Sequence, residues 1–269
     1  MSELSKKTSA LFKDGGYLSD MESWCSRIRV DHATWFALVQ EISSAGMNIL
    51  QDARPSKTDN QQLLVVLLHA RALQSFQACL LLAERGLISD ARTLSRCVWE
   101  DAFCIGALFE KQQEYLGKFE TKHQKHRHGV ANAFLNKDNL RNGLSIESIE
   151  KLQQVVDETK DAKDSWKWEI VAHDAGMGAL YDTHYRNLSS DAAHPTLESL
   201  TRHVETDIEG NITQMSWLPN EKDLDDTLAV ACAAYLCAAL RTAELFHLSD
   251  IEENIKKLTR RYVELSNTL

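Results

Sequence analysis

GLISDARTLSRCVWEDAFCIGALF, residues 86–109, is the stretch that decides the fold. It reads as a helix that is apolar apart from one stripe, on which Arg92, Arg96 and Glu100 follow each other at four-residue intervals. Residues four apart lie one above the other on a helix, so these three charges share a line. Charges beside a core are costly unless they are paired. We therefore expect this helix to meet polar partners from elsewhere in the chain.

The best partners in the sequence form a second polar cluster, made of Tyr185, Ser189 and His194. Tyr181, Tyr185 and Ser189 share one helical stripe. His194 precedes Pro195, where the chain leaves the helix because a residue before proline disfavours helical geometry. An imidazole titrates near neutral pH, and at a helix end with one face open it suits general acid–base work. The two clusters together are the candidate site.

The composition predicts long helices with short connections. Only 3 prolines and 11 glycines occur in 269 residues, a chain long enough to bury a sizeable core. We expect an all-α, single-domain, antiparallel helix bundle. Residues 1–57 hold N-terminal helices, residues 58–269 hold the helical bundle, and the two are expected to form one compact unit.

Helix ends are marked by capping and terminating residues. Ser19, Thr58 and Ser249 each begin a capping box, and Gly86 is a natural left-handed helix end. Ser89 is expected to cap the helix that carries Arg92, Arg96 and Glu100. The expected helices span about 31–53, 59–85, 89–112, 114–136, 145–163, 164–174, 177–193, 223–248 and 251–267. One stretch departs from this pattern: HVETDIEGNITQMSW, residues 203–217, predicts a small β-hairpin flap that turns at Gly210 and Asn211.

Charge and cysteine usage point to a cytoplasmic protein. The net charge of −9 opposes a general nucleic-acid coat or a binder of anionic membranes, but it leaves room for a local basic groove. The six cysteines lack metal-ligand spacing and read as buried thiols. The N-terminus lacks the apolar core of a signal peptide, and the apolar runs 63–83 and 228–240 read as buried helices, not membrane spans. We expect no cofactor, no metal and no membrane.

The candidate residues also carry a resemblance to a known family. The helix with Arg96 and Glu100, preceded by LLLAERGLISDARTLSR, and the later stretch from Tyr185 to His194 resemble the all-helical bacterial domain-of-unknown-function family 5677. The likeness covers about residues 61–195. It implies a helical domain in which five polar residues meet, namely Arg96, Glu100, Tyr185, Ser189 and His194. It implies no particular reaction.

A second resemblance concerns RNA cleavage. Residues 186–194, RNLSSDAAH, are similar to the signature of HEPN-type helical ribonucleases, whose arginine and histidine act together on a scissile phosphate. That family places four to six residues between the two, whereas seven separate Arg186 from His194 here. On a straight helix this offset turns the side chains about 80° apart and ~12 Å along the axis. Either a kink, or an arginine from the Arg92/Arg96 helix, is needed to complete such a site.

A basic stretch offers a place for RNA. Residues 118–141 hold six cations against two acids; the cations are Lys118, Lys122, Lys125, Arg127, Lys137 and Arg141. In an acidic chain such a local excess predicts contact with a phosphate backbone. The alternative is a solvated helix face.

Two functions of different class follow. The first is a HEPN-like, metal-independent endoribonuclease or toxin-type effector in defence, with His194 as general acid–base and Arg96 or Arg186 as phosphate clamp. Glu100 and Tyr185 would orient them. The resemblance implies a homo-dimer for such an enzyme. The second is a non-catalytic binding or interaction module, in which the same residues form a buried structural network.

Overall fold

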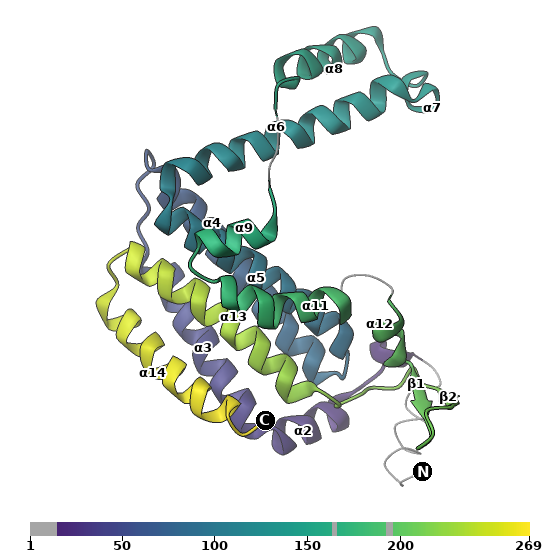
Figure 1. The fold of residues 1–269 in the computed structure, drawn as a ribbon. Coiled ribbons are helices and arrows are strands. Elements are labelled where there is room, and N and C mark those ends of the chain that lie inside the picture. Colours follow the sequence, from purple (N-terminus) through teal and green to yellow (C-terminus); the bar gives the residue numbers. More distant parts are fainter. Residues whose placement is uncertain (1–14, 163–165, 192–195) are drawn as a thin grey trace.

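Three long helices form the centre of the protein (Figure 1). The computed structural model describes residues 15–162, 166–191 and 196–269. The central helices are α4 (Asn60–Glu84), α5 (Ile88–Glu110) and α13 (Leu224–Leu245). They pack extensively on one another, and α13 presents mostly alanine and other small residues, which allow close approach.

Three further long helices cover one side of this centre (Figure 1). They are α2 (Glu22–Asp31), α3 (Ala33–Asp52) and α14 (Ser249–Ser266). Helices α3 and α14 pack on α13 and on each other. The expected all-α architecture with a small hairpin is confirmed. The expected division at residue 57 stays a prediction, although α3, which lies before that point, contacts the central helices directly.

A helical arm stands away from the body (Figure 1). It consists of α6 (Gln112–Asn136), α7 (Asp138–Arg141) and α8 (Ile146–Thr159). Helices α6 and α8 pack on each other. At their interface the His128 ring bridges the two helices, with Nδ1 3.1 Å from Thr159 Oγ1 and Nε2 3.1 Å from Asn132 Nδ2. His128 is therefore part of the arm's own packing.

The other elements of the body are short, and they include the turn that carries Tyr185 and the helix that carries Ser189. They comprise the 3-10 turn η1 (Gly16–Leu18), α9 (Trp168–Asp174), α10 (Gly178–Leu180), the π-helical turn η2 (Tyr181–Tyr185), α11 (Arg186–Asp191), α12 (Leu197–Thr201), β1 (Val204–Thr206) and β2 (Ile212–Met215). The two strands pair antiparallel, with Val204 opposite Met215, and the turn uses Gly210 at a φ of 86°. The predicted hairpin is thus confirmed.

Several predicted helix starts are wrong by one to three residues. The side chain that caps α4 is Asp59, which accepts a hydrogen bond from the Gln62 N–H, and not Thr58. Ser89 lies inside α5, and helices α2 and α14 have no side-chain cap at Ser19 or Ser249. Small polar residues occur at neighbouring positions near these helix starts, so the sequence places the first helical residue only to within a few positions.

Within the part of the chain that the structure describes, two helices have the length and hydropathy to cross a membrane. Helix α13 is mostly buried within the bundle, as a core helix is, whereas α4 is buried over a smaller share of its length. Both properties are weak evidence about location, so the cytoplasmic assignment stays a prediction. All six cysteines are free thiols, and four of them are buried.

Gly86 joins α4 to α5 in a way that no other residue allows. Its φ is 77°, and its carbonyl accepts from the Asn220 N–H at 3.2 Å. A Cβ at this position would lie 2.7 Å from the Asn220 nitrogen and 2.8 Å from Pro219 Cβ. Positive φ and a close backbone approach both require glycine here.

We predict that Gly86→Ala lowers the free energy of unfolding by about 2–4 kcal/mol, because strain and a backbone clash add. Gly117→Ala is the matched control: Gly117 lies in α6 with nothing within 4 Å of the added Cβ. That change should leave stability equal or raise it by up to about 1 kcal/mol. Urea denaturation of both variants measures the difference, and equal effects would contradict the role given to Gly86.

Candidate functional site

The structure brings Arg96, Glu100 and Tyr185 together. Arg96 Nε and Nη2 each donate to the Tyr185 hydroxyl at 3.1 Å, and that hydroxyl donates to Glu100 Oε1 at 2.8 Å. Arg96 Nε also lies 3.4 Å from Glu100 Oε1. One phenol therefore joins both charges of an i, i+4 pair on α5 to a segment 85 residues further along the chain.

Tyr185 is held in place by aromatic packing. Its side chain is nearly fully buried, stacked on Tyr181 at 5.2 Å between ring centroids and set edge-on to Phe103 at 5.6 Å. The π-helical turn aligns Tyr181 and Tyr185 in this stack, and such turns are frequent at functional sites. Burial and the neighbouring Glu100 carboxylate raise the pKa of Tyr185 well above its ordinary value. The hydroxyl therefore stays protonated and acts as donor and acceptor within the network.

Other predicted residues lie outside this network. Ser189 Oγ donates to the Tyr185 carbonyl at 3.1 Å, a bond within its own helix. Arg186 is 66% exposed and pairs with Asp182 at 3.3 Å. Residues 186–191 are regular α-helix, so the kink needed to align Arg186 with His194 is not among them. His194 itself lies outside the described residues.

Arg92 serves a different contact. Its buried guanidinium donates from Nη1 to Asp226 Oδ2 at 2.6 Å and lies 3.5 Å from Thr227 Oγ1. Both partners belong to α13, so this arginine fastens α5 to the neighbouring central helix.

The basic residues of the arm meet a cluster of aromatic rings. Lys122 Nζ lies 4.0 Å from the centre of the Trp166 ring and 5.1 Å from that of Trp168, within cation–π distance of both. The two indoles meet edge to face at 5.6 Å. Their two-residue spacing in SWKW predicts that they point in different directions, but the irregular chain before α9 turns both toward Lys122.

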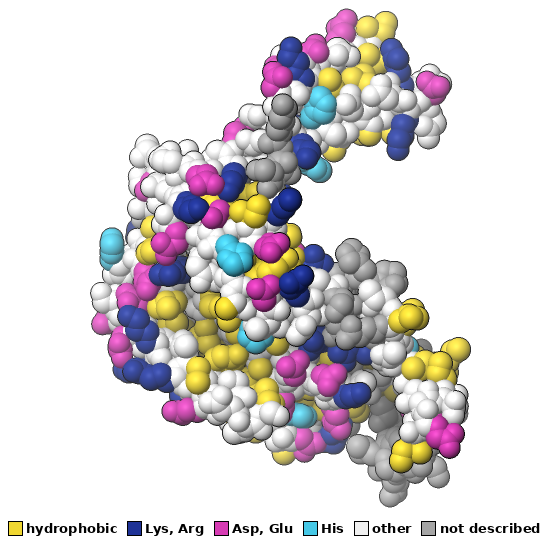
Figure 2. Space-filling model, viewed as in Figure 1, with side chains coloured by type: hydrophobic (Ala, Val, Ile, Leu, Met, Phe, Trp, Pro, Cys, Tyr) yellow, Lys and Arg dark blue, Asp and Glu magenta, His cyan; other side chains and the backbone are white. Residues whose placement is uncertain are grey.

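A shallow groove runs along the same face of α6. It has a volume of about 510 Å³, and its lining residues follow helical spacing: Lys122, Lys125, His126, Gly129, Val130 and Ala133. Arg127 is exposed on α6 and does not line the groove. Figure 2 shows the hollow between arm and body, with Lys and Arg side chains on both of its sides.

Aromatic contacts connect the groove to the polar network. Trp168 lies 5.6 Å from Trp166 and 6.4 Å from Tyr185, between ring centroids. The guanidinium of Arg96 lies 5.2 Å from the centre of the Tyr185 ring. A continuous series of rings thus leads from Lys122 on the arm to Arg96 on the body.

Asp101 is a buried carboxyl that sequence analysis missed. Its side chain is 1% exposed; Oδ1 lies 3.1 Å from Arg71 Nη1, and Oδ2 has no hydrogen-bond partner among the described residues. Burial raises the pKa of Asp101 to about 7, against the lowering effect of Arg71. The only signal in the sequence was a polar pair, Arg71 on an apolar helix and Asp101 beside Glu100, with nothing to connect the two.

Because of Asp101, we predict that the free energy of unfolding falls as the pH rises. The folded-state pKa of about 7 exceeds the ordinary value of 3.8, so between these two pH values the unfolded chain releases the proton more readily. Stability then decreases across that window, by at most about 4 kcal/mol. Asp101→Asn mimics the protonated form, so it should match the wild type near pH 4 and be more stable at pH 8.

Urea denaturation at both pH values measures this difference. Asp157→Asn, an exposed change on α8, is the control and should show no such divergence. Buried His69 acts in the opposite direction, since burial lowers the pKa of His69 to about 4, but its contribution is common to all three proteins. A variant that is destabilised equally at both pH values would show that the ion pair with Arg71 outweighs burial.

Comparison with known proteins agrees with the resemblance seen in the sequence. Residues 62–212 match the model of a family of unknown function, DUF5677. The chain has no detectable match among curated proteins or solved structures. The matched region includes α4, α5, the arm and the Tyr185 segment, and it covers more than half of the chain. The chain therefore belongs to the DUF5677 family.

Proposed function

We propose that this protein binds single-stranded RNA in the hollow between the arm and the body. The observation that carries the proposal is the position of Lys122, whose ammonium lies over Trp166 and beside Trp168 at the mouth of a basic groove. Proteins that bind single strands combine cations that follow the backbone with aromatic rings on which bases stack. The groove supplies the cations and the two indoles supply the rings.

The charge distribution supports a local site of this kind. The chain carries a net charge of −9, so attraction of a polyanion must come from a restricted region. Lys122 and Lys125 line the groove, and Lys137 and Arg141 are exposed farther along the arm. These four cations lie on one projecting element, the helical arm (Figure 1).

The polar network fits a positioning role. Arg96, Glu100 and Tyr185 satisfy one another, which leaves the guanidinium neutralised by its own helix neighbour. Tyr185 in turn contacts Trp168, one of the two rings beside Lys122, so the network helps to hold that ring in place. This arrangement favours a structural and not a catalytic role for these three residues.

We predict that Lys122→Gln combined with Lys125→Gln weakens binding of a single-stranded RNA at least tenfold. For each phosphate that the variant no longer neutralises, the slope of log affinity against log salt should also become shallower by about 0.7. The control is Lys151→Gln, which removes an exposed cation of α8 outside the groove. Fluorescence anisotropy at several salt concentrations measures both quantities, and a double variant that binds like the control would contradict the proposal.

A second candidate function is RNA cleavage by a metal-independent, HEPN-like reaction. The observation in its favour is the π-helical turn, which sets Tyr185 against Arg96 of α5. Tyr185 precedes His194 by nine residues in the sequence. In this reaction Arg96 would hold the phosphate and His194 would transfer the proton. The homo-dimer and the toxin-type role in defence belong to this candidate and stay predictions.

Cleavage is tested by comparing RNA degradation by the wild type and by His194→Ala, with a chelator present in both assays. If the protein is such a ribonuclease, the substitution should abolish cleavage while RNA binding persists, and the chelator should have no effect on cleavage. Equal turnover in a clean preparation would remove the nuclease and leave the binding function standing. Arg186→Ala serves as the comparison, because the exposed ion pair of Arg186 with Asp182 places it apart from Arg96.

A further inference from the structure

A second pocket lies at the opposite end of α5 from the arm. It is formed where the Gly86 turn and the first turn of α5 meet η1 and the loop that follows β2. Its volume is about 130 Å³. Sites for drug-sized ligands measure roughly 300–1,000 Å³, so this pocket suits a single ring system.

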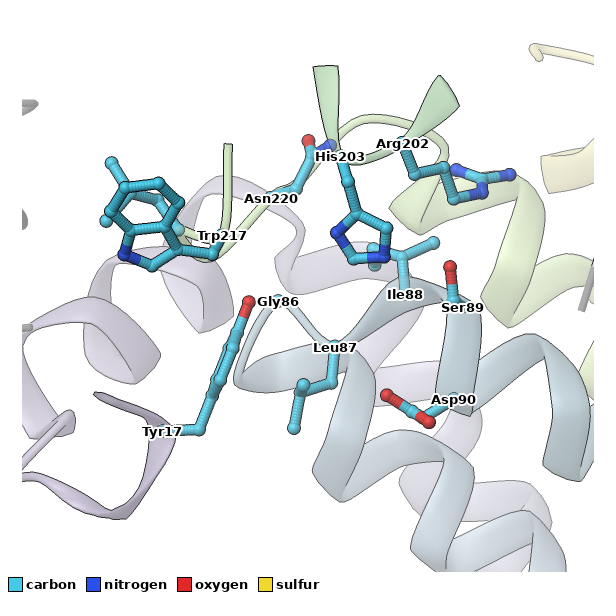
Figure 3. A pocket seen from close by; sticks show the side chains of 11 residues that line it. Tyr17, Gly86, Leu87, Ile88, Ser89, Asp90, Arg202, His203, Trp217 and Asn220 are labelled. Carbon is cyan, nitrogen blue, oxygen red and sulfur yellow. The ribbon is translucent and has the colours of Figure 1, made fainter. Parts of the chain in front are cut away.

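The walls of the pocket are aromatic. In Figure 3 the Trp217 and Tyr17 rings stand on one side and the His203 ring stands on the other, above the turn at Gly86 and Leu87. Trp217 is 70% exposed, an unusual position for the largest apolar side chain unless something covers it. Rings placed in this way suit a flat, aromatic ligand.

The frame of the pocket is fixed before any ligand arrives. The Gly86 carbonyl accepts from the Asn220 N–H at 3.2 Å, which ties the α4–α5 turn to the loop after β2. Arg85 Nη1 donates to the Tyr17 carbonyl at 3.2 Å, which ties η1 to the same turn. A site that is already formed loses little conformational entropy when it binds.

The polar groups select a neutral heterocycle. The Ser89 hydroxyl, the Asp90 carboxylate and the His203 imidazole offer donors and acceptors around the ring site. Arg202 is bound to Asp223 at 2.9 Å, and the Asp90 carboxylate adds negative charge, so a phosphate is disfavoured here. The pocket therefore suits an uncharged heterocyclic base, with any phosphate that is attached to it lying outside the pocket.

We propose that this pocket binds a nucleobase, which stacks on Trp217 and is read by the polar groups around Ser89. The inference goes beyond the groove of the arm and uses none of its residues. The same ring chemistry occurs in a free nucleoside and in a base of an RNA strand. Experiments with both ligands distinguish these two sources.

In the test, the full chain is titrated separately with adenosine, guanosine, cytidine and uridine, and binding is measured by ligand-observed NMR. A short single-stranded RNA is titrated in parallel. Trp217→Ala should weaken binding of the preferred base at least fivefold, since a stacked base depends strongly on its aromatic partner. The control is Met215→Ala, an exposed change on β2 that does not line the pocket. Circular dichroism verifies that both variants keep the wild-type fold.

The outcomes separate cleanly. Nucleoside binding that Trp217→Ala weakens supports a free ligand, and an effect of this variant on the RNA alone assigns the base to a strand. The pocket proposal is overturned when Trp217→Ala changes neither ligand's affinity. The Lys122/Lys125 double variant should leave nucleoside binding unchanged, so failure of the groove and failure of the pocket are distinguishable.

Discussion

Helix α5 runs through the middle of the bundle and carries four ionisable side chains into surroundings where an unpaired charge is costly. They are answered from three sides: Arg92 by α13, Arg96 and Glu100 together by Tyr185, and Asp101 by α4. These interactions fix the rotation of α5 as well as its position, because turning the helix would separate charges from their partners. The arm and the Tyr185 segment are placed relative to this fixed helix.

The sequence allowed part of this arrangement to be foreseen. Arg92, Arg96 and Glu100 share a stripe at four-residue spacing, a pattern visible in one dimension, and it indicated that a polar partner must come from elsewhere. Asp101 escaped notice because a helix turns its side chain about 100° away from that of Glu100 and toward α4. Its partner Arg71 lies 30 residues earlier, and no local rule connects the two.

The arm was foreseen as helices but not as a projecting element. Periodicity identifies the apolar face of α6 and of α8, yet it does not say whether that face packs on the core or on a neighbour. Here the two helices mainly cover each other. The role of the SWKW tryptophans was missed for a related reason, since their shared direction depends on an irregular segment and not on a helix or strand period. The groove beside Lys122 and its neighbouring indole rings could therefore be recognised only from the structure.

The length of α5 separates the two proposed sites and gives each its own chemistry. The pocket lies at its first turn and the arm begins after its last, so 23 residues at 1.5 Å each place them about 35 Å apart. The groove on the arm offers cations, with Lys122 against two half-buried indole rings, which suit the repeated backbone and the bases of a strand. The pocket offers one ring-sized space with a carboxylate at its edge, which suits a single uncharged base. A nucleoside lacks the phosphates that the groove requires, and a backbone phosphate is repelled where Asp90 lines the pocket. In these proposals, affinity for a polyanion resides on the arm that follows the last turn of α5, and selection of a base resides at the first turn of α5.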